Sequence, residues 1–411
     1  MLVNAGAVGG ALLAGLAVPD ASSALSQQPA AVPPPPPVAP NDPTSVLGAP
    51  TSSAGERSPF ELSARSPTGE TAGSSLTPLQ RLNGTVTPSD LHFERHHSGV
   101  PFIDPAKHAL LVHGLTDRPL SFSLDDLQRF PQVTRTYFME CSGNGRASYR
   151  APMPEMTAQR VAGLSSNTEW TGVPLRYLLD EAGVASSATW CLAEGADSCL
   201  MARSIPVDKL RDDALVVWAQ NGEPLRPAQG YPMRLLLPGW EGNANVKWLR
   251  RLEFGTAPWM TRWETSKYTD PLQNGTARQF SFDQDAKSIV TSPSHPDVLA
   301  VQGWRPITGL AWSGRGPITR VEVSTDNGAT WYDADFLTTP IAKAQVRFQY
   351  MWNWTGGEAT LLSRATDSTG YIQPTRSALL AVRGLGTDFH FNHIVGWRVQ
   401  ADGRVFFHGL T

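Results

Sequence analysis

The sequence predicts an α+β protein, in which a first domain of mixed strands and short helices precedes an immunoglobulin-like β-sandwich. Between residues 76 and 275, apolar runs with strand character alternate with short helical patterns, whereas strand patterns recur at regular intervals from Ser288 onward. The chain has 411 residues, 41% hydrophobic and 17% charged, which is enough for two folded domains. Its net charge of -3 and its lack of a basic block argue against nucleic-acid binding.

Residues 1–24 have features of a partial export signal. Positions 2–18 are apolar and rich in small residues, and an Ala-Ser-Ser-Ala run at 21–24 suits a signal peptidase. The stretch is too short and too glycine-rich for a membrane span. No lysine or arginine precedes Arg57, so either the start lies inside a longer signal or export is weak. The alternative is a flexible tail.

Residues 25–75 are predicted to form a disordered linker. Nine of the 22 positions from Pro29 to Pro50 are proline, and serine, threonine and glycine follow. Such a composition is typical of an extended spacer without a core. The folded chain is therefore expected to begin near Leu76.

A cysteine at the end of a predicted strand is the candidate centre of chemistry. Residues 133–141 are rich in β-branched and aromatic side chains, and Ser-Gly-Asn-Gly follows Cys141. A thiol beside a glycine-rich loop and Arg146 is well placed to be a thiolate, the form that binds metals. The alternative is a buried, inert cysteine.

The other two cysteines flank a turn in a predicted hairpin. In an oxidising compartment Cys191 and Cys199 could form a disulfide, which would leave Cys141 alone, and the sequence leaves this open. No Cys-x-x-Cys-His motif occurs, so this chain is not expected to attach a c-type haem.

Local signals place further elements of the first domain. The expected strands are 109–114, 120–122, 214–219 and 231–237. The expected helices are 124–127, capped by Ser123, and 174–182, which Gly183 ends. Asn221-Gly222 is typical of a tight hairpin turn.

Two loops have the character of binding elements. Residues 91–101 are aromatic and basic and contain three histidines, but their spacing supports no metal site, so a solvated loop is the alternative. Lys247 follows the glycine-spaced loop 238–243 within an apolar run. A buried lysine needs an anionic partner, whereas a lysine that reaches outward needs none, and both remain open.

The second domain is expected to span residues 276–385. Its predicted strands include 318–324, 330–332, 345–352, 359–365 and 378–382. Sandwiches of this kind commonly supply interfaces, so a dimerisation role is expected, with passive scaffolding as the alternative. Residues 386–411 are predicted to form a C-terminal hairpin or tail around the Asp402-Gly403 turn.

Four segments in this order make the chain similar to the sulfite oxidase family of molybdenum enzymes. They are residues 78–84, 91–97, 140–146 and 238–243. Within the family the chain most resembles the molybdenum subunits of sulfane dehydrogenases (SoxC-like). The resemblance implies a mixed α/β molybdopterin-binding catalytic domain at 76–275 and an immunoglobulin-like dimerisation domain at 276–385.

The resemblance also implies roles for individual residues. Cys141 would be the protein thiolate on molybdenum, beside a pterin dithiolene. The residues that fall where the family holds the pterin are His97, Arg234 and Lys247. Those that fall where it lines an oxyanion pocket are Arg95, Arg146 and Tyr268.

Two departures from the family pattern affect the pocket. Gln229 stands where the family has a pterin-contacting histidine, and Arg160 stands where sulfite oxidases have a tryptophan. A more open pocket than that of an enzyme committed to free sulfite is therefore expected.

The function implied by the resemblance is molybdenum-dependent oxidation of reduced sulfur, on a carrier protein or as sulfite. Electrons would pass to a c-type cytochrome subunit. The protein would be periplasmic, a homodimer through the sandwich or a heterotetramer, with no membrane span. The alternatives are a sulfite dehydrogenase acting on free sulfite, a methionine-sulfoxide reductase subunit, a group that lacks the sandwich, and a non-catalytic exported binding protein.

Overall fold

The computed structural model describes residues 42–272 and 274–409, which divide into two units, 42–61 and 62–409. In the first unit, Asp42 caps a 3-10 helix, Pro43–Ser45, and its carboxylate accepts a hydrogen bond from the Thr44 N–H at 2.8 Å. The expected export signal and the first part of the linker lie outside the described residues.

The larger unit begins with a small antiparallel sheet of β1 (Ser66–Thr68), β2 (Ser74–Leu76) and β3 (Glu94–Arg95). This corrects the expectation that the linker continues to residue 75. The β1–β2 turn is tight, since a side chain at Gly73 would lie 2.6 Å from the carbonyl oxygen of Thr68. The polar composition of β1 and β2 gave no strand signal, and β3, the strand that completes this sheet, comes 18 residues later in the chain.

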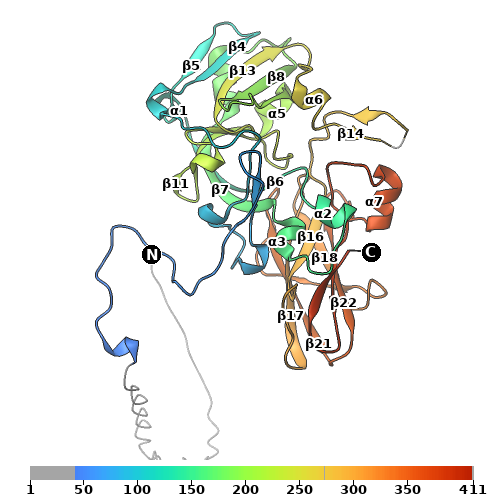
Figure 1. Ribbon diagram of the computed structural model, residues 1–411. Helices are drawn as coiled ribbons and strands as arrows, with labels where there is room; N and C mark the ends of the chain where they lie inside the picture. The colour runs from blue at the N-terminus through green and yellow to red at the C-terminus, as the bar shows by residue number, and fades with distance from the viewer. Residues whose placement is uncertain (1–41, 273, 410–411) are drawn as a thin grey trace, which may run out of the picture. The chain divides into compact units, whose positions relative to one another are not determined.

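Two five-stranded sheets form the first domain. In one, the order is β11 (Glu223–Pro224), β10 (Leu215–Gln220), β7 (Ser165–Pro174) and β6 (Val133–Glu140), with β12 (Arg234–Leu236) also paired to β10. In the other, it is β5 (Leu120–Phe122), β4 (Leu110–Gly114), β13 (Leu249–Gly255), β8 (Trp190–Gly195) and β9 (Ala202–Pro206). Only the β4–β13 pair among them is parallel. Figure 1 shows β6 and β7 between the sheet of β13 and the sandwich.

Short helices connect these strands. They are α1 (Leu124–Leu127), α2 (Arg146–Arg150), α3 (Ala158–Ala162), α4 (Leu175–Ala182), α5 (Val207–Asp212) and α6 (Arg262–Thr265). The two helices expected from the sequence are confirmed. Ser123 and Asp126 form a capping box on α1, and Gly183 ends α4 in the left-handed conformation, with φ 62°. Further 3-10 turns lie at Leu79–Arg81, Ser89–Leu91, Pro105–Lys107 and Pro227–Gln229.

The second domain is a β-sandwich, as expected. One sheet has the order β16 (Lys287–Ser292), β17 (Gly303–Trp312), β21 (Val346–Trp354) and β20 (Asp335–Phe336). The other has β19 (Tyr332–Asp333), β18 (Ile318–Ser324), β22 (Ala359–Asp367), β23 (Gly396–Val399) and β24 (Val405–His408). The predicted last hairpin is thus β23–β24, which pairs with β22. A small hairpin, β14 (Asp270–Pro271) and β15 (Ala277–Arg278), precedes the sandwich.

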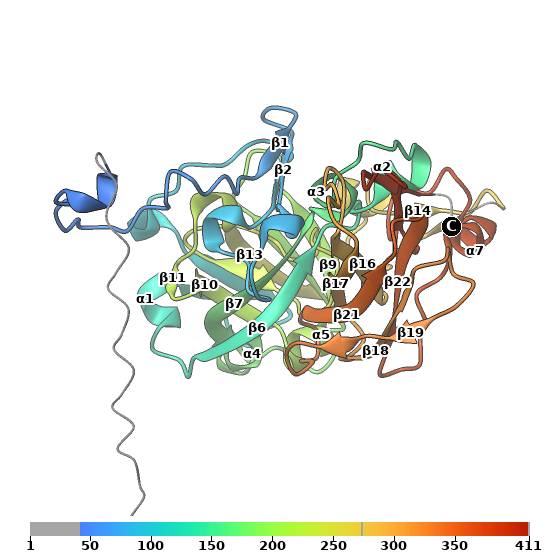
Figure 2. The same ribbon diagram turned by 90° about the horizontal axis from the view of Figure 1, so that it is seen from below.

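Some local predictions were wrong. Residues 378–382 are not a strand but part of helix α7 (Arg376–Arg383), because Thr375 caps it by accepting from the Ala378 N–H at 3.2 Å. Both ribbon views show α7 near α2 (Figures 1 and 2), and Arg376 donates to the carbonyl oxygen of Tyr149 at 2.7 Å. The strand expected at 231–237 is shorter and consists of β12, Arg234–Leu236. The Asn221-Gly222 turn connects β10 to β11 and not to this strand.

The sandwich shares its hydrophobic core with residues from the first half of the chain. Besides Trp312, Phe348 and Trp397 of the sandwich, this core contains Phe138 of β6 and Val161 of α3. A second core lies between the sheet of β13 and helices α4 and α5. The two domains are therefore packed through buried apolar contacts and not merely linked. No helix in the described part of the chain has the length and apolar character to cross a membrane.

Candidate active site

A cationic pocket lies among β3, the loop after β6 and the loop before β13. It contains about 680 Å³ of space, counting solvent at its mouth. The sequence-predicted site residues that line it are Arg95, His97, Cys141, Gln229, Arg234, Lys247 and Tyr268. The fold thus brings together residues from well-separated parts of the chain.

Cys141 follows β6 directly, and its backbone is fixed on both sides. Its N–H donates to the carbonyl oxygen of Leu164 at 3.0 Å, and its own carbonyl accepts from the Asn144 N–H at 2.9 Å. Burial raises the pKa of the Cys141 thiol, an effect opposed by the backbone N–H of Gly143 and by nearby arginines. The thiol of the cofactor-free chain is therefore protonated at neutral pH, and a bound metal ion would displace that proton.

His97 and Tyr268 form a direct contact in the pocket wall. His97 Nε2 lies 2.6 Å from the Tyr268 hydroxyl. Burial, helped by the neighbouring Arg95, lowers the pKa of His97 to about 4, and burial raises the pKa of Tyr268. At neutral pH the uncharged imidazole therefore accepts a hydrogen bond from the phenol. Trp263 packs on His97 with ring centroids 4.8 Å apart, which restricts the orientation of the imidazole.

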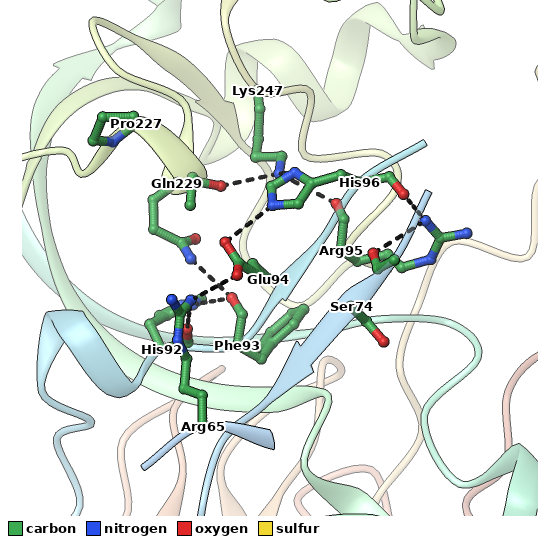
Figure 3. Close-up of polar contacts among 12 residues, drawn as sticks. Arg65, Ser74, His92, Phe93, Glu94, Arg95, His96, Pro227, Gln229 and Lys247 are labelled. Atoms are coloured by element: carbon green, nitrogen blue, oxygen red, sulfur yellow. Dashed lines mark hydrogen bonds and ion pairs between the residues drawn. The ribbon is translucent and has the colours of Figure 1, made fainter. Parts of the chain in front are cut away.

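Lys247 reaches into the pocket, and the acceptors of its hydrogen bonds are neutral (Figure 3). Its Nζ donates to the carbonyl oxygens of Arg95 at 3.2 Å and Ala228 at 3.0 Å, and to His96 Nδ1 at 2.8 Å. His96 Nε2 in turn donates to Glu94 Oε2 at 3.0 Å, which fixes its tautomer. Burial lowers the pKa of Lys247 well below its usual value. An anion in this pocket would offset that cost.

Arg234 and Gln229 form the floor of the pocket. Arg234 donates from Nη1 to the Gln229 carbonyl and from Nη2 to the Asn245 carbonyl, each at 3.0 Å. Gln229 donates from Nε2 to the carbonyl oxygen of Phe93 at 2.8 Å (Figure 3). Burial lowers the pKa of Arg234 to about 9. Gln229 thus links the floor to Phe93, the residue that directly precedes β3.

Arg95 is held by the hairpin that the sequence did not predict. Its Nη1 donates to the carbonyl oxygen of His96 and, at 3.4 Å, to that of Gly73 in the β1–β2 turn. Its Nη2 approaches His97 Nδ1 at 3.5 Å. Gly73, which was expected to lie in the linker, therefore helps to orient Arg95.

Arg146 does not line this pocket. Its guanidinium donates to the carbonyl oxygen of Asp388 at 3.1 and 2.6 Å. It lines a separate hollow together with Arg150 and Arg160. A Cβ on Gly143 would lie 3.2 Å from Arg146 Nη2 and 4.0 Å from Cys141 Sγ, so the guanidinium and the sulfur both lie close to this glycine.

The cysteines are all free, so the disulfide considered from the sequence does not form. Cys191 points into the core between β13 and α4, whereas Cys199 packs beside Trp263 and its Sγ donates to Asp197 Oδ2 at 2.9 Å. The β8–β9 hairpin is real, but its register pairs Cys191 with Ile205.

Several lining residues escaped the sequence analysis as site residues. They are His92, His96, Met139, Asp197, Met201, Asn243, Asn245 and Trp248. Asn243 lies in a loop that the sequence did single out, whereas Asp197 and Met201 come from the β8–β9 turn, which carried no signal of a pocket. Side chains such as these are brought to a site by sheet pairing, which local patterns do not encode.

The pocket suits an anionic, metal-bearing group. Three cationic side chains line it against two carboxylates, those of Glu94 and Asp197, and two of the cations are too buried to be solvated fully. Among the described residues, Arg234 Nε and Asn243 Oδ1 are buried without a hydrogen-bond partner. Buried polar atoms rarely stay unpaired, so these atoms are available to a ligand. With the Cys141 thiol in the wall, the donors fit a molybdenum–pterin cofactor with its phosphate.

Fold and site together define a molybdopterin oxidoreductase. Residues 97–263 match the oxidoreductase molybdopterin binding domain, and residues 278–397 match the Mo-co oxidoreductase dimerisation domain. The chain belongs to the sulfite oxidase family of molybdenum enzymes. The expected fold class, enzyme class and molybdenum–pterin cofactor are thereby confirmed.

Individual relatives fall into two groups. The crystal structure of the sulfane dehydrogenase SoxCD from Paracoccus pantotrophus is 42% identical, with a TM-score of 0.86, over 89% of this chain and 96% of that chain. NADH nitrate reductase from Solanum lycopersicum is 31% identical over 75% of this chain and 38% of its own length. NAD(P)H nitrate reductase from Hordeum vulgare is 31% identical over 70% and 36%. The chain thus spans little more than a third of these reductases.

Proposed function

We propose that this protein oxidises reduced sulfur carried on another protein and passes the electrons to a c-type cytochrome subunit. The observation that carries the proposal is the similarity to SoxCD, which extends over nearly the whole of both chains. The nitrate reductases match a smaller share of this chain at lower identity and are much longer proteins. Sulfane oxidation is therefore the best-supported activity.

The site residues are assigned as follows in this proposal. Cys141 binds molybdenum through its sulfur. The pterin and its phosphate are held by His97, Gln229, Arg234 and Lys247. The sulfur substrate's oxygens are bound by Arg95, Tyr268 and Arg146, which lies against Gly143. When bound, the cofactor supplies a two-electron acceptor that oxidises sulfur with oxygen from water.

The chain's own groups would then have distinct tasks. Lys247 and Arg234 neutralise the cofactor's phosphate in a partly dehydrated pocket, where charge-assisted hydrogen bonds are strong. The Arg95 guanidinium offers a planar fork of donors to an oxyanion. Tyr268 donates a hydrogen bond to His97 in the free pocket, and the same hydroxyl donates to a substrate oxygen when substrate is bound.

The assembly and location complete the proposal. Residues 76–275 act as the catalytic domain and 276–385 as a dimerisation domain, in a homodimer or a heterotetramer with the cytochrome subunit, and the dimerisation-domain match supports this. The apolar N-terminus supports export to the periplasm.

Steady-state assays of the molybdenum-loaded protein with cytochrome c as electron acceptor test the activity. A thiosulfate-loaded carrier protein, free sulfite and, with a reductant in place of the acceptor, nitrate are compared. Turnover with the carrier at a higher kcat/KM than with sulfite supports the proposal. Preference for free sulfite would establish the sulfite dehydrogenase alternative, and reaction with nitrate alone would overturn both.

A further inference from the structure

The carboxylate that directly precedes Cys141 is held by both domains. Glu140 is the last residue of β6, and its side chain is buried. Its Oε1 accepts from Asn144 Nδ2 at 2.8 Å and from Lys287 Nζ at 2.9 Å. Its Oε2 accepts from Trp312 Nε1 at 2.6 Å. Four polar side chains thus meet at Glu140, the residue that precedes the candidate metal ligand in the chain.

Two of these donors belong to the sandwich. Lys287 begins β16 and Trp312 ends β17, and the two residues are direct partners in the antiparallel register. The Lys287 side chain is only 6% exposed and that of Glu140 only 3%. A buried charge is tolerated only when it is paired and hydrogen-bonded, so each group depends on the other.

The network continues into the loop that presents the sulfur. Asn144, held by Glu140, donates from its N–H to the Cys141 carbonyl at 2.9 Å. Its Oδ1 accepts from the Leu164 N–H at 3.1 Å, and the Leu164 carbonyl accepts from the Cys141 N–H at 3.0 Å. Lys287 Nζ also donates to the Asn144 carbonyl at 3.4 Å. The position of Cys141 therefore depends on a lysine of the other domain.

We infer that Lys287 and Trp312 are positioning residues for the Cys141 sulfur, so that the sandwich completes the metal site. This rests on the proposed role of Cys141 as metal ligand. If Lys287 is lost, Glu140 keeps a buried carboxylate without a counter-charge, and it must move or draw in water. Asn144 loses its anchor at the same time, and the loop opens locally.

The test uses the full chain with Lys287→Met, prepared without the cofactor. The rate at which iodoacetamide alkylates Cys141 is measured by mass spectrometry of its peptide, with Cys199 as an internal reference. We expect the Cys141 rate to rise about fivefold or more, because local opening exposes the thiol. In the loaded enzyme, the same variant is expected to change the electron paramagnetic resonance signal of molybdenum and to lower kcat.

Lys343→Met is the matched control. Lys343 also joins the two domains, through Asp213 at 2.6 Å, but it does not line the pocket and its ammonium makes no contact with Glu140. A Cys141 rate that stays within about twofold of wild type in Lys287→Met, or rises equally in Lys343→Met, would overturn the inference. If Lys287→Met does not fold, Trp312→Phe, which removes the indole donor and part of the ring but leaves the Lys287–Glu140 pair, is held to the same criterion.

These outcomes are separable from failure of the proposed function. The alkylation assay contains no metal, so it reports loop position whether or not the protein oxidises sulfur. If the wild-type protein takes up molybdenum but does not oxidise sulfur, the proposed activity is refuted and the positioning role of Lys287 and Trp312 still stands. An altered alkylation rate with an unchanged molybdenum spectrum would overturn the claim that the sandwich shapes the metal site.

Discussion

The hydroxyl of Tyr268 lies 2.6 Å from Nε2 of His97, although 171 positions separate the two residues in the chain. His97 follows β3, and Tyr268 follows α6 in a left-handed backbone conformation, with φ 41°. Because burial keeps His97 uncharged and Tyr268 protonated, the pair presents a neutral hydrogen-bonding wall to an otherwise cationic pocket.

Tyr268→Phe is expected to lower kcat/KM for the sulfur substrate roughly 10- to 100-fold, since a hydrogen bond to a charged oxygen contributes about 1.5–3 kcal/mol. Molybdenum content should stay the same. Tyr371→Phe is the control, because the Tyr371 hydroxyl accepts from Asn392 Nδ2 at 3.1 Å and lies outside the pocket lining. Equal activity losses in the two variants would argue against a substrate role for Tyr268.

Cys141→Ser is expected to abolish turnover in a protein that still folds, because the smaller, harder oxygen does not replace a thiolate on molybdenum. Turnover, metal content and the thermal unfolding midpoint are measured together. Cys199→Ser, at a half-buried thiol nearby, should retain activity. A fully active Cys141→Ser protein would refute the ligand assignment.

Lys247→Met is expected to reduce the cofactor content of the purified protein about tenfold or more, since a charge-assisted contact to phosphate is lost. Lys209→Met is the control, because Lys209 is also largely buried but pairs with Asp213 at 2.6 Å instead of facing the pocket. Cofactor is quantified by pterin fluorescence after release. Equal cofactor loss in both variants would show general destabilisation.

Because of the buried ring of His393, we expect the free energy of unfolding to be sensitive to acid. Its ring is 1% exposed, and neither ring nitrogen has a hydrogen-bond partner among the described residues. Burial, together with Lys287 and Arg376, lowers its pKa to about 3, whereas an unfolded histidine titrates near 6.5. Between these values the unfolded chain binds more protons, so the free energy of unfolding falls as the pH falls through this window.

His393→Phe should therefore lose less stability on acidification than wild type. From pH 6.5 to 4.5 the difference should move in favour of the variant by about 2 to 3 kcal/mol, the value for two pH units of one proton. Urea unfolding of the cofactor-free proteins at both pH values measures this. Above pH 7 the difference in the free energy of unfolding between variant and wild type should change no further. A pH-independent difference would contradict the prediction.

Much of the first domain could be predicted because its signals are local. Strand β6 ends at Cys141 where an apolar run meets turn residues, and Ser123 and Gly183 mark helix ends through their own hydrogen bonds or backbone conformation. The prediction of a strand at 378–382 was wrong because five apolar residues fit a strand and a helix equally well. The N-cap formed by Thr375 favours the helix.

By itself the sequence determined the order of the elements, the two-domain plan and, through its resemblance to a family, the residues that meet around Cys141. Only the tertiary structure decided that Arg146 lies outside the pocket lining, that the hairpin at residues 66–76 supports Arg95, and that Lys287 of the sandwich neutralises Glu140. The physical reason is that these contacts depend on strand pairing and domain packing across long stretches of chain. Such contacts leave no periodicity or spacing in the sequence around either partner.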